Sequence, residues 1–436
     1  MKKILLISLF FANNISGQEV KLTDKNEATI QQQVWRLTEV MYHDVVNPPA
    51  AARFYAYSVL TGYEILSQLD PSVVPFQHTF KDYPNTKTLV QPAVNTELAV
   101  MYGILETGKN IIPSGYLLEE RQNELVQAYR NRNLATVVID SSIALAQNIS
   151  KLIVQYSRTD GYFKLSTRQR YKPLGTKATW NPTPPEYMAA VEPHWRTIRT
   201  FILDSAQQFK PTAPVPFNED ISSGFIKLAR EVYVTVSQLT EEQKLIADFW
   251  DCNPFAVQFQ GHMSIGLKKI SPGGHWMSIA GIASKKAGLD IKATMLLHTL
   301  VALTLHDAFI SCWDEKYRSN RIRPETAINR YIDPKWKPMI QTPPFPEYSS
   351  GHSVISTAAA EVLTWFLGDN FSFNDSTETY LGLPSRKFSS FRAAAAEARI
   401  SRLYGGIHFR DAIENGGEQG RNIGEFIIKH LAILGH

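Results

Sequence analysis

Residues 296–309 read LLHTLVALTLHDAF, and this apolar stretch of the 436-residue chain decides the fold. It belongs to an amphipathic helical pattern that runs from about 277 to 312. His298, His306 and Asp307 interrupt it, so it falls short of the ~18 uninterrupted apolar residues of a membrane span. We therefore expect a core helix in a soluble chain without a membrane span. His306 and Asp307 either face a site near Trp313 or form a satisfied buried pair.

Similar helical patterns cover most of the chain on both sides of this segment. They lie at about 28–69, 93–109, 116–157, 220–236, 240–250, 352–367, 386–404 and 409–433. Alternating strand-like runs are few, so the sequence predicts a mainly α fold. Residues 158–218 are rich in Pro, Tyr and Trp and cannot sustain a helix. We expect this excursion to pack across the helices, because its aromatic side chains would be wasted in a flexible tether.

The N-terminus resembles an export signal. Lys2 and Lys3 precede the apolar run 4–12, and small residues follow around Ser16 and Gly17. This pattern predicts a signal peptide at 1–17, a mature domain at 18–436 and a secreted or periplasmic protein. A short buried helix is the alternative interpretation.

Composition and charge favour a globular protein with a small-molecule partner. The 44% apolar and 11% aromatic content is enough to bury a large core. The net charge of +4 is spread along the chain, so no basic block indicates a nucleic acid or a membrane surface. Two cysteines, Cys252 and Cys312, cannot form a disulfide framework in a chain of this length, and their pairing stays open.

Three short segments in the last third of the chain carry residues suited to chemistry. The first is Trp313-Asp314-Glu315-Lys316 followed by Arg323-Pro324. Lys316 and Arg323 are seven residues apart and share a helix face if the helix persists, although Pro324 implies a break nearby. On its own this segment is also compatible with a solvated lysine and arginine.

The second segment is Phe345-Pro346-Glu347-Tyr348-Ser349-Ser350-Gly351-His352, which leads into an apolar helix. A Ser-Gly pair at a helix start leaves backbone N–H groups unpaired, and such groups suit an oxyanion. The alternative is an ordinary N-cap with His352 packed in the first turn.

The third segment is Ser401-Arg402-Leu403-Tyr404-Gly405-Gly406-Ile407-His408. The two glycines should end one helix and let the next begin near His408. A histidine at a helix N-terminus is pushed toward its neutral form, which is the form that binds a metal centre. A structural histidine is the alternative.

Together the three segments resemble the signature of the vanadium-dependent haloperoxidases and the related type 2 phosphatidic acid phosphatases and bacterial class A acid phosphatases. That signature is Lys, six residues, Arg-Pro; then Pro-Ser-Gly-His; then Ser-Arg, five residues, His, three residues, Asp. The lysine segment matches fully, whereas Ser349 replaces the proline and Asp411 follows His408 after two residues. Support of His408 by a carboxylate is therefore open among Asp411, Glu414 and a backbone carbonyl. The Trp180–Pro185 stretch, WNPTPP, also resembles bacterial haloperoxidases.

The resemblance implies a fold of two helical bundles with the oxyanion between them, split at about 18–218 and 219–436. It implies a vanadate cofactor, with hydrogen peroxide, a halide ion and small organic acceptors as partners. It makes His408 the vanadium ligand, and His352 and Lys316 the catalytic groups that exchange a proton and polarise the peroxide. The implied donors to vanadate are Lys316, Arg323, Ser350, Gly351 and Arg402.

The same resemblance leaves a phosphatase with a phospho-histidine intermediate as the main alternative, and a non-catalytic oxyanion binder as a second one. Trp313 and Phe345 favour the haloperoxidase, because they match aromatic positions on the halide side of haloperoxidase sites. The segment as a whole looks most like bacterial iodide-specific members, so iodide is the expected halide. A monomer is favoured. For His262 and His275, structural hydrogen bonding is favoured over a place at the cavity mouth.

Overall fold

Helices dominate the computed structural model, which describes residues 29–77, 79–87, 93–260 and 263–433. The predicted signal peptide and His262 lie outside these residues. The α-helices are α1 (Ile30–His43), α2 (Pro48–Leu69), α3 (Thr96–Ile111), α4 (Leu118–Asn131), α5 (Thr136–Arg158), α6 (Gly224–Ser237), α7 (Glu241–Phe249), α8 (Pro272–Ala287), α9 (Ile291–Ser319), α10 (Pro324–Tyr331), α11 (Gly351–Leu367), α12 (Phe391–Tyr404) and α13 (Arg410–Ile433).

The remaining regular elements are short. The 3-10 helices are η1 (Gly115–Leu117), η2 (Tyr162–Thr167), η3 (Trp195–Thr197) and η4 (Thr377–Leu381). The described strands form two antiparallel pairs, β1 (Val257–Gln260) with β2 (Met263–Gly266) and β3 (Phe373–Asp375) with β4 (Arg386–Phe388). The predicted mainly α class is confirmed.

Several predicted helices are interrupted where local chemistry ends a helix. The pattern at 28–69 splits because Asn47 caps α2 by accepting the Ala50 amide at 2.9 Å, and two prolines follow it. The pattern at 277–312 splits at Gly288, whose φ of 62° ends α8 in the left-handed conformation. The pattern at 116–157 is broken at 132–135, and α10 was not predicted.

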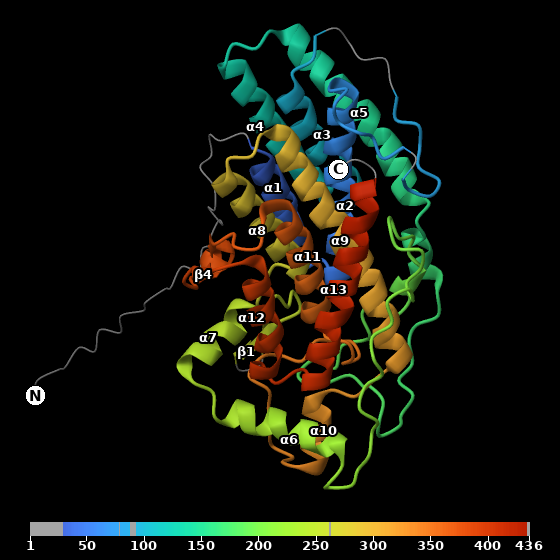
Figure 1. Cartoon of the computed structure of the whole chain (residues 1–436), viewed down its shortest axis with the longest axis vertical. Coiled ribbons are helices and arrows are strands. Elements are labelled where there is room, and N and C mark those ends of the chain that lie inside the picture. The colour runs from blue at the N-terminus through green and yellow to red at the C-terminus, as the bar shows by residue number, and fades with distance from the viewer. Residues whose placement is uncertain (1–28, 78, 88–92, 261–262, 434–436) are drawn as a thin grey trace, which may run out of the picture.

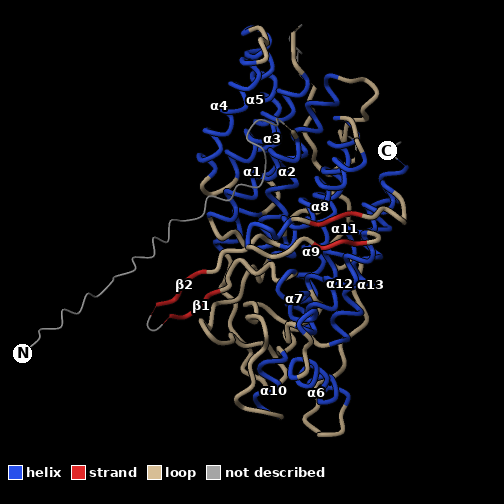
Figure 2. Tube along the Cα trace, turned by 90° about the vertical axis from the view of Figure 1, so that its left-hand side faces the viewer, coloured by secondary structure: helices blue, strands red, loops and turns tan. Residues whose placement is uncertain are grey.

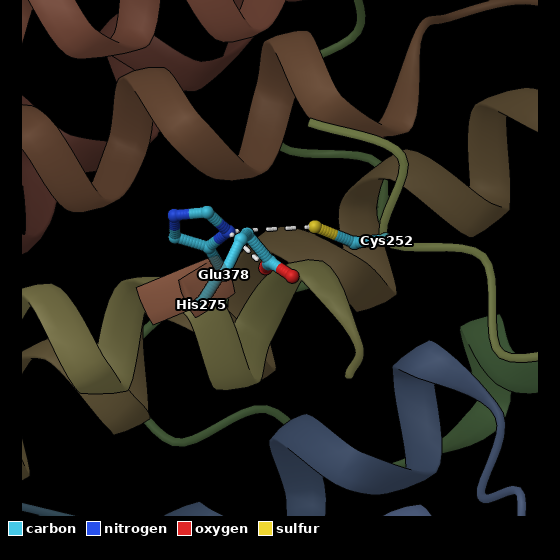
Figure 3. Close-up of side chains that lie close together, drawn as sticks. All are labelled: Cys252, His275 and Glu378. Carbon is cyan, nitrogen blue, oxygen red and sulfur yellow. Dashed lines mark hydrogen bonds and ion pairs between the residues drawn. The ribbon is translucent and has the colours of Figure 1, made fainter. Parts of the chain in front are cut away.

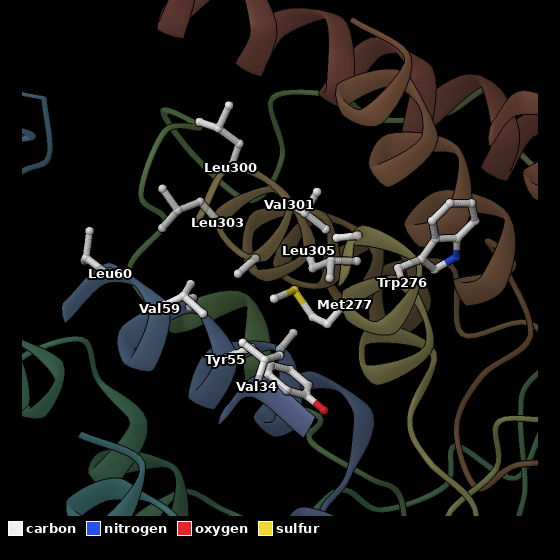
Figure 4. Close-up of a cluster of buried hydrophobic side chains, with 14 of the residues drawn as sticks. Val34, Tyr55, Val59, Leu60, Trp276, Met277, Leu300, Val301, Leu303 and Leu305 are labelled. Carbon is white, nitrogen blue, oxygen red and sulfur yellow. The ribbon is translucent and has the colours of Figure 1, made fainter. Parts of the chain in front are cut away.

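Helix α9 is the centre of the core. Asp290 caps it by accepting the Ala293 amide at 2.8 Å, and it then runs for 29 residues. Figure 4 shows its leucines and Val301 packed against Val34 of α1, Val59 of α2 and Met277 of α8. Helix α9 is therefore a core helix, although polar side chains interrupt its apolar run.

Two groups of packed helices share α9. Helices α2, α3 and α5 pack together on one side, whereas α11 packs with α12 and α13 on the other, and α9 contacts both α2 and α11. Figures 1 and 2 show α4 and α5 at one end of the molecule and α6 and α10 at the opposite end. Two described helical stretches, 136–167 and α9, are long and apolar enough to cross a membrane, but the apolar window of α9 is 94% buried inside the protein.

The excursion at 158–218 packs across the helices, as predicted. The carboxylate of Asp307 accepts hydrogen bonds from the amides of residues 201–203 at 2.7 to 2.9 Å. His306 Nε2 lies 3.0 Å from the carbonyl oxygen of Arg199. Asp307 is therefore a satisfied buried carboxylate, whereas His306 Nδ1 has no partner among the described residues. Both residues hold the excursion against α9. Two of its tryptophans, Trp180 and Trp195, are fully buried.

Candidate active site

The chain between α9 and α10 places Lys316 and Arg323 on different elements, with the helix break near Pro324 that the sequence predicts. Helix α9 ends at Ser319 because Asn320 takes a left-handed φ of 49°. Arg323 then caps α10, and Pro324 occupies the first helical position. Both cations nevertheless contact the 345–349 segment. Arg323 Nε donates to the Phe345 carbonyl at 2.9 Å, and Lys316 Nζ donates to the Ser349 carbonyl at 2.6 Å.

The second segment forms a helix start with open amides, as predicted. Ser350 caps α11, and its own amide donates to the Ala412 carbonyl at 3.1 Å. Among the described residues, the amides of Gly351 and His352 make no hydrogen bond. A Cβ on Gly351 would lie 3.9 Å from Lys316 and Trp313, so packing alone does not demand glycine. The missing side chain instead leaves the amides accessible from the cavity beside them.

The third segment also folds as predicted. Helix α12 ends at Tyr404, Gly406 takes a φ of 77°, and α13 begins at Arg410, two residues after His408. The turn buries the His408 ring, with Nε2 located 3.2 Å from Arg323 Nη1.

Glu347 supports His408, a role that the sequence does not predict. Its Oε1 lies 2.9 Å from His408 Nδ1 and also accepts the Phe409 amide at 2.9 Å. A carboxylate on Nδ1 orients the ring and directs the Nε2 lone pair outward. The only signal in the sequence is an acidic residue in a largely apolar stretch. In the fold, the Glu347 side chain is fully buried.

The three groups that the sequence suggested as partners of His408 Nδ1 do not contact it. Asp411 instead pairs with Arg321 at 2.8 and 2.9 Å and accepts the Val215 amide. Glu414 lies 3.8 Å from Arg410 in an exposed ion pair. No backbone carbonyl replaces them, because Glu347 already occupies Nδ1.

Arg323 and Arg402 lie near His408 and the cavity beside it, and each has a guanidinium donor without a hydrogen-bond partner in the described part of the chain. Arg323 Nη1 donates to the Ile407 carbonyl at 2.8 Å, whereas its buried Nη2 has no partner among the described residues. Arg402 Nε donates to Ser401 Oγ at 2.9 Å and its Nη2 donates to the Trp250 carbonyl at 2.7 Å. Both guanidinium groups are therefore fixed in orientation, which suits paired donation to an oxyanion.

Lys316 is held differently from the arginines. Its Nζ donates to the carbonyls of Pro346, Glu347 and Ser349 at 3.1, 3.2 and 2.6 Å. An ammonium has three donors, so contact with a bound anion requires the exchange of at least one of these carbonyls. Burial lowers the pKa of Lys316 to about 8. Its role toward peroxide stays a prediction.

A cavity of about 40 Å³ brings most of the predicted site residues together. This volume has room for roughly three water-sized groups. The lining includes Trp313, Phe345, Gly351, His352, Arg402 and His408. The ring centroids of Trp313 and Phe345 lie 5.0 Å apart, and the two rings form an apolar wall. Their place on the halide side stays a prediction. Lys316, Arg323 and Ser350 are not among the residues that line it.

Both histidines of the cavity are neutral. Burial and the charge of Arg402 hold the pKa of His352 well below its ordinary value. Burial, Arg323 and Lys316 do the same for His408. His352 Nε2 is buried and has no hydrogen-bond partner among the described residues. The cavity thus offers a free imidazole nitrogen, a second imidazole supported by a carboxylate, and several cationic donors.

Comparisons with known proteins show which family the chain resembles. Residues 296–434 match the family model described as VCPO second helical-bundle domain. The chain is 43% identical to a protein whose crystal structure is described as the first bacterial vanadium-dependent iodoperoxidase, with a TM-score of 0.84 and 91% of this chain and 95% of that chain covered. The chain belongs to the vanadium-dependent haloperoxidase family.

More distant family structures share the fold. Holo and apo structures of bacterial vanadium-dependent chloroperoxidase are each 14% identical to this chain, with TM-scores of 0.64. The holo structure covers 95% of this chain and 96% of its own, and the apo structure covers 89% and 96%. None of the curated protein sequences matches the chain.

The residues of this haloperoxidase fit vanadate. The unpartnered Arg323 Nη2 and the open amides of Gly351 and His352 are all donors, as an oxyanion requires. A neutral His408 with a carboxylate on Nδ1 offers Nε2 as a metal ligand.

Removal of the Glu347 carboxylate should weaken vanadate binding. We expect Glu347→Ala to lower vanadate affinity by about 10- to 100-fold, because His408 loses the group that orients it. Glu347→Gln should lose less, since an amide oxygen still accepts from Nδ1. Titration calorimetry with vanadate measures both. Glu414→Gln is the matched control, because Glu414 forms an exposed ion pair with Arg410 and contacts neither His408 nor Glu347. An equal loss of affinity in the control would contradict the assignment to Glu347.

Proposed function

We propose that this protein catalyses the vanadate-dependent oxidation of a halide by hydrogen peroxide, with iodide as the preferred halide. The reaction consumes hydrogen peroxide, a halide ion and a proton, and it yields hypohalous acid and water. The observation that carries the proposal is the cavity, where a carboxylate-supported neutral histidine faces fixed cationic donors beside an aromatic wall. Secretion and a monomeric state stay predictions.

The chain's own residues would hold vanadate from several sides. His408 Nε2 would bind the metal once it gives up its 3.2 Å contact with Arg323 Nη1. Arg323, Arg402 and the amides at the start of α11 would donate to the vanadate oxygens. When bound, vanadate supplies Lewis-acid activation of hydrogen peroxide toward attack by a halide.

His352 is placed to move the proton. Its Nε2 is buried and unpartnered, and its low pKa leaves the ring neutral and able to accept a proton from hydrogen peroxide. Arg402 lines the same cavity and disfavours a lasting positive charge on His352. His352 would therefore return the proton readily, which suits the formation of hypohalous acid and water.

The aromatic wall supports iodide as the substrate. Trp313 Nε1 already donates to the Val191 carbonyl at 3.2 Å, and Phe345 has no polar atom in its ring. The wall thus offers apolar, polarisable contact and no hydrogen bond from these two side chains. Iodide is the most polarisable and most easily oxidised of the three common halides. The 43% identical relative described as an iodoperoxidase adds support.

Halide kinetics test the proposal. We expect the vanadate-loaded protein to oxidise iodide best, bromide weakly or not at all, and chloride not detectably. Steady-state measurements of kcat/KM at matched pH and fixed hydrogen peroxide give the comparison. The vanadate-free protein is the control in each series. A bromide efficiency equal to or above that for iodide would refute the choice of halide, and failure with every halide would refute the proposed activity.

A further inference from the structure

A cysteine, a histidine and a glutamate meet beside the active-site cavity, and the proposed reaction does not use them. Cys252 lies in the loop after α7, His275 in α8 and Glu378 in η4 (Figure 3). One ligand atom from each residue lies within 4.8 Å of the other two, and all three side chains are buried. Cys252 and Cys312 are both free thiols and form no disulfide with each other.

One of the separations equals that between two ligands of a small tetrahedral cation, and a second is slightly shorter. Cys252 Sγ lies 3.6 Å and Glu378 Oε1 lies 2.9 Å from His275 Nδ1. Bonds to zinc of about 2.0 to 2.3 Å place tetrahedral ligands roughly 3.3 to 3.7 Å apart. The thiol and imidazole already match this spacing, whereas the carboxylate has to open by a few tenths of an ångström.

The surroundings prepare His275 for a ligand at Nδ1. Its other nitrogen, Nε2, lies 2.7 Å from Asp375 Oδ2, which fixes the ring as a metal-binding histidine is usually fixed. The Trp250 ring stacks on the imidazole at 4.5 Å and excludes water from its face. Glu378 Oε1 is buried, and His275 Nδ1, at 2.9 Å, is its ion-pair partner. This pair needs a proton on Nδ1, and a metal ion bound to both atoms would take the place of that proton.

We propose that Cys252, His275 and Glu378 bind one divalent transition-metal ion, with zinc the best match to a sulfur, nitrogen and oxygen donor set. Binding forms three metal–ligand bonds and releases the thiol proton of Cys252, together with any proton on His275 Nδ1. The thiolate and the Glu378 carboxylate then neutralise the two positive charges of the ion. A water-sized ligand completes the tetrahedron, and no redox step is involved.

This metal site would brace the vanadate cage without touching vanadate. The metal would tie the loop of Cys252 to α8 and η4, and Trp250 in that loop accepts the hydrogen bond from Arg402 Nη2 at 2.7 Å. Cys252 also lines the active-site cavity. Metal binding at these three side chains does not depend on the proposed oxidation of iodide.

Cobalt substitution tests the site. The full-length protein is stripped with a chelator, titrated with Co²⁺ alone, and followed by optical absorption and elemental analysis. We expect one equivalent of tightly bound Co²⁺, a thiolate-to-cobalt charge-transfer band and the visible bands of a tetrahedral ion. The band should vanish in Cys252→Ser and persist in Cys312→Ser, the matched variant of the other buried cysteine. Asp375→Asn should weaken binding by about 10- to 100-fold.

Each outcome supports or overturns the proposal. Loss of the charge-transfer band in Cys252→Ser and loss of stoichiometric binding in Glu378→Gln support it, provided that circular dichroism shows folded variants. If a variant does not fold, the wild-type spectrum decides, because a cobalt form without a thiolate band overturns the proposal. Equal cobalt content in the wild type and in folded Cys252→Ser and Glu378→Gln also overturns it. None of these readouts requires halide oxidation.

Discussion

His408→Ala is expected to leave the protein without vanadium after dialysis against vanadate-free buffer, whereas the wild type retains about one equivalent. The substitution removes the one neutral nitrogen that Glu347 directs toward the cavity. The loss of affinity should exceed the roughly 10- to 100-fold expected when only a supporting residue is removed. Elemental analysis measures the vanadium content, and iodide oxidation should fall with it.

The controls for His408→Ala separate the metal bond from general damage. His43→Ala removes an exposed histidine of α1 and should retain wild-type vanadium content. A thermal unfolding curve shows whether His408→Ala remains folded, because the cavity left by the ring is buried. Retention of stoichiometric, tightly bound vanadium by folded His408→Ala would contradict its assignment as the ligand.

The second large effect is expected for His352→Ala, which should retain measurable vanadate binding and lose turnover. We expect kcat for iodide oxidation to fall by about 10²- to 10⁴-fold, the range for removal of a positioned acid–base group. The physical reason is that the buried, unpartnered Nε2 of His352 is the neutral proton acceptor of the cavity. Steady-state kinetics at saturating vanadate, with vanadium content measured in parallel, separate turnover from cofactor loss. Equal loss of vanadium in both histidine variants would reject this division of roles.

The sequence predicted those features that depend on local chemistry. The helix start at Ser350 follows from a hydroxyl cap, and the end of α12 follows from Gly405 and Gly406. The neutral state of His408 was also expected, but for a different reason. The expectation rested on the helix dipole, whereas burial, Arg323 and Lys316 lower the pKa in the folded protein.

Features that depend on tertiary contacts were not predictable from periodicity. Glu347 and His408 are 61 residues apart, and only the fold brings them together. Asp411 does not reach His408, because it forms an ion pair with Arg321 instead. Arg321 also lies 3.5 Å from Glu347 Oε2. In the same way, the three carbonyls around Lys316 Nζ come from a segment 30 to 33 residues further along the chain.

Reconstitution with vanadate tests the central claim most directly. The purified protein is freed of vanadium and assayed for iodide oxidation by hydrogen peroxide while orthovanadate is added stepwise, with and without excess phosphate. We predict negligible activity before the addition, saturation at about one vanadate per chain, and slower recovery in phosphate, because both oxyanions compete for the same donors. Iodide oxidation that is unchanged by exhaustive removal of vanadium would contradict the account.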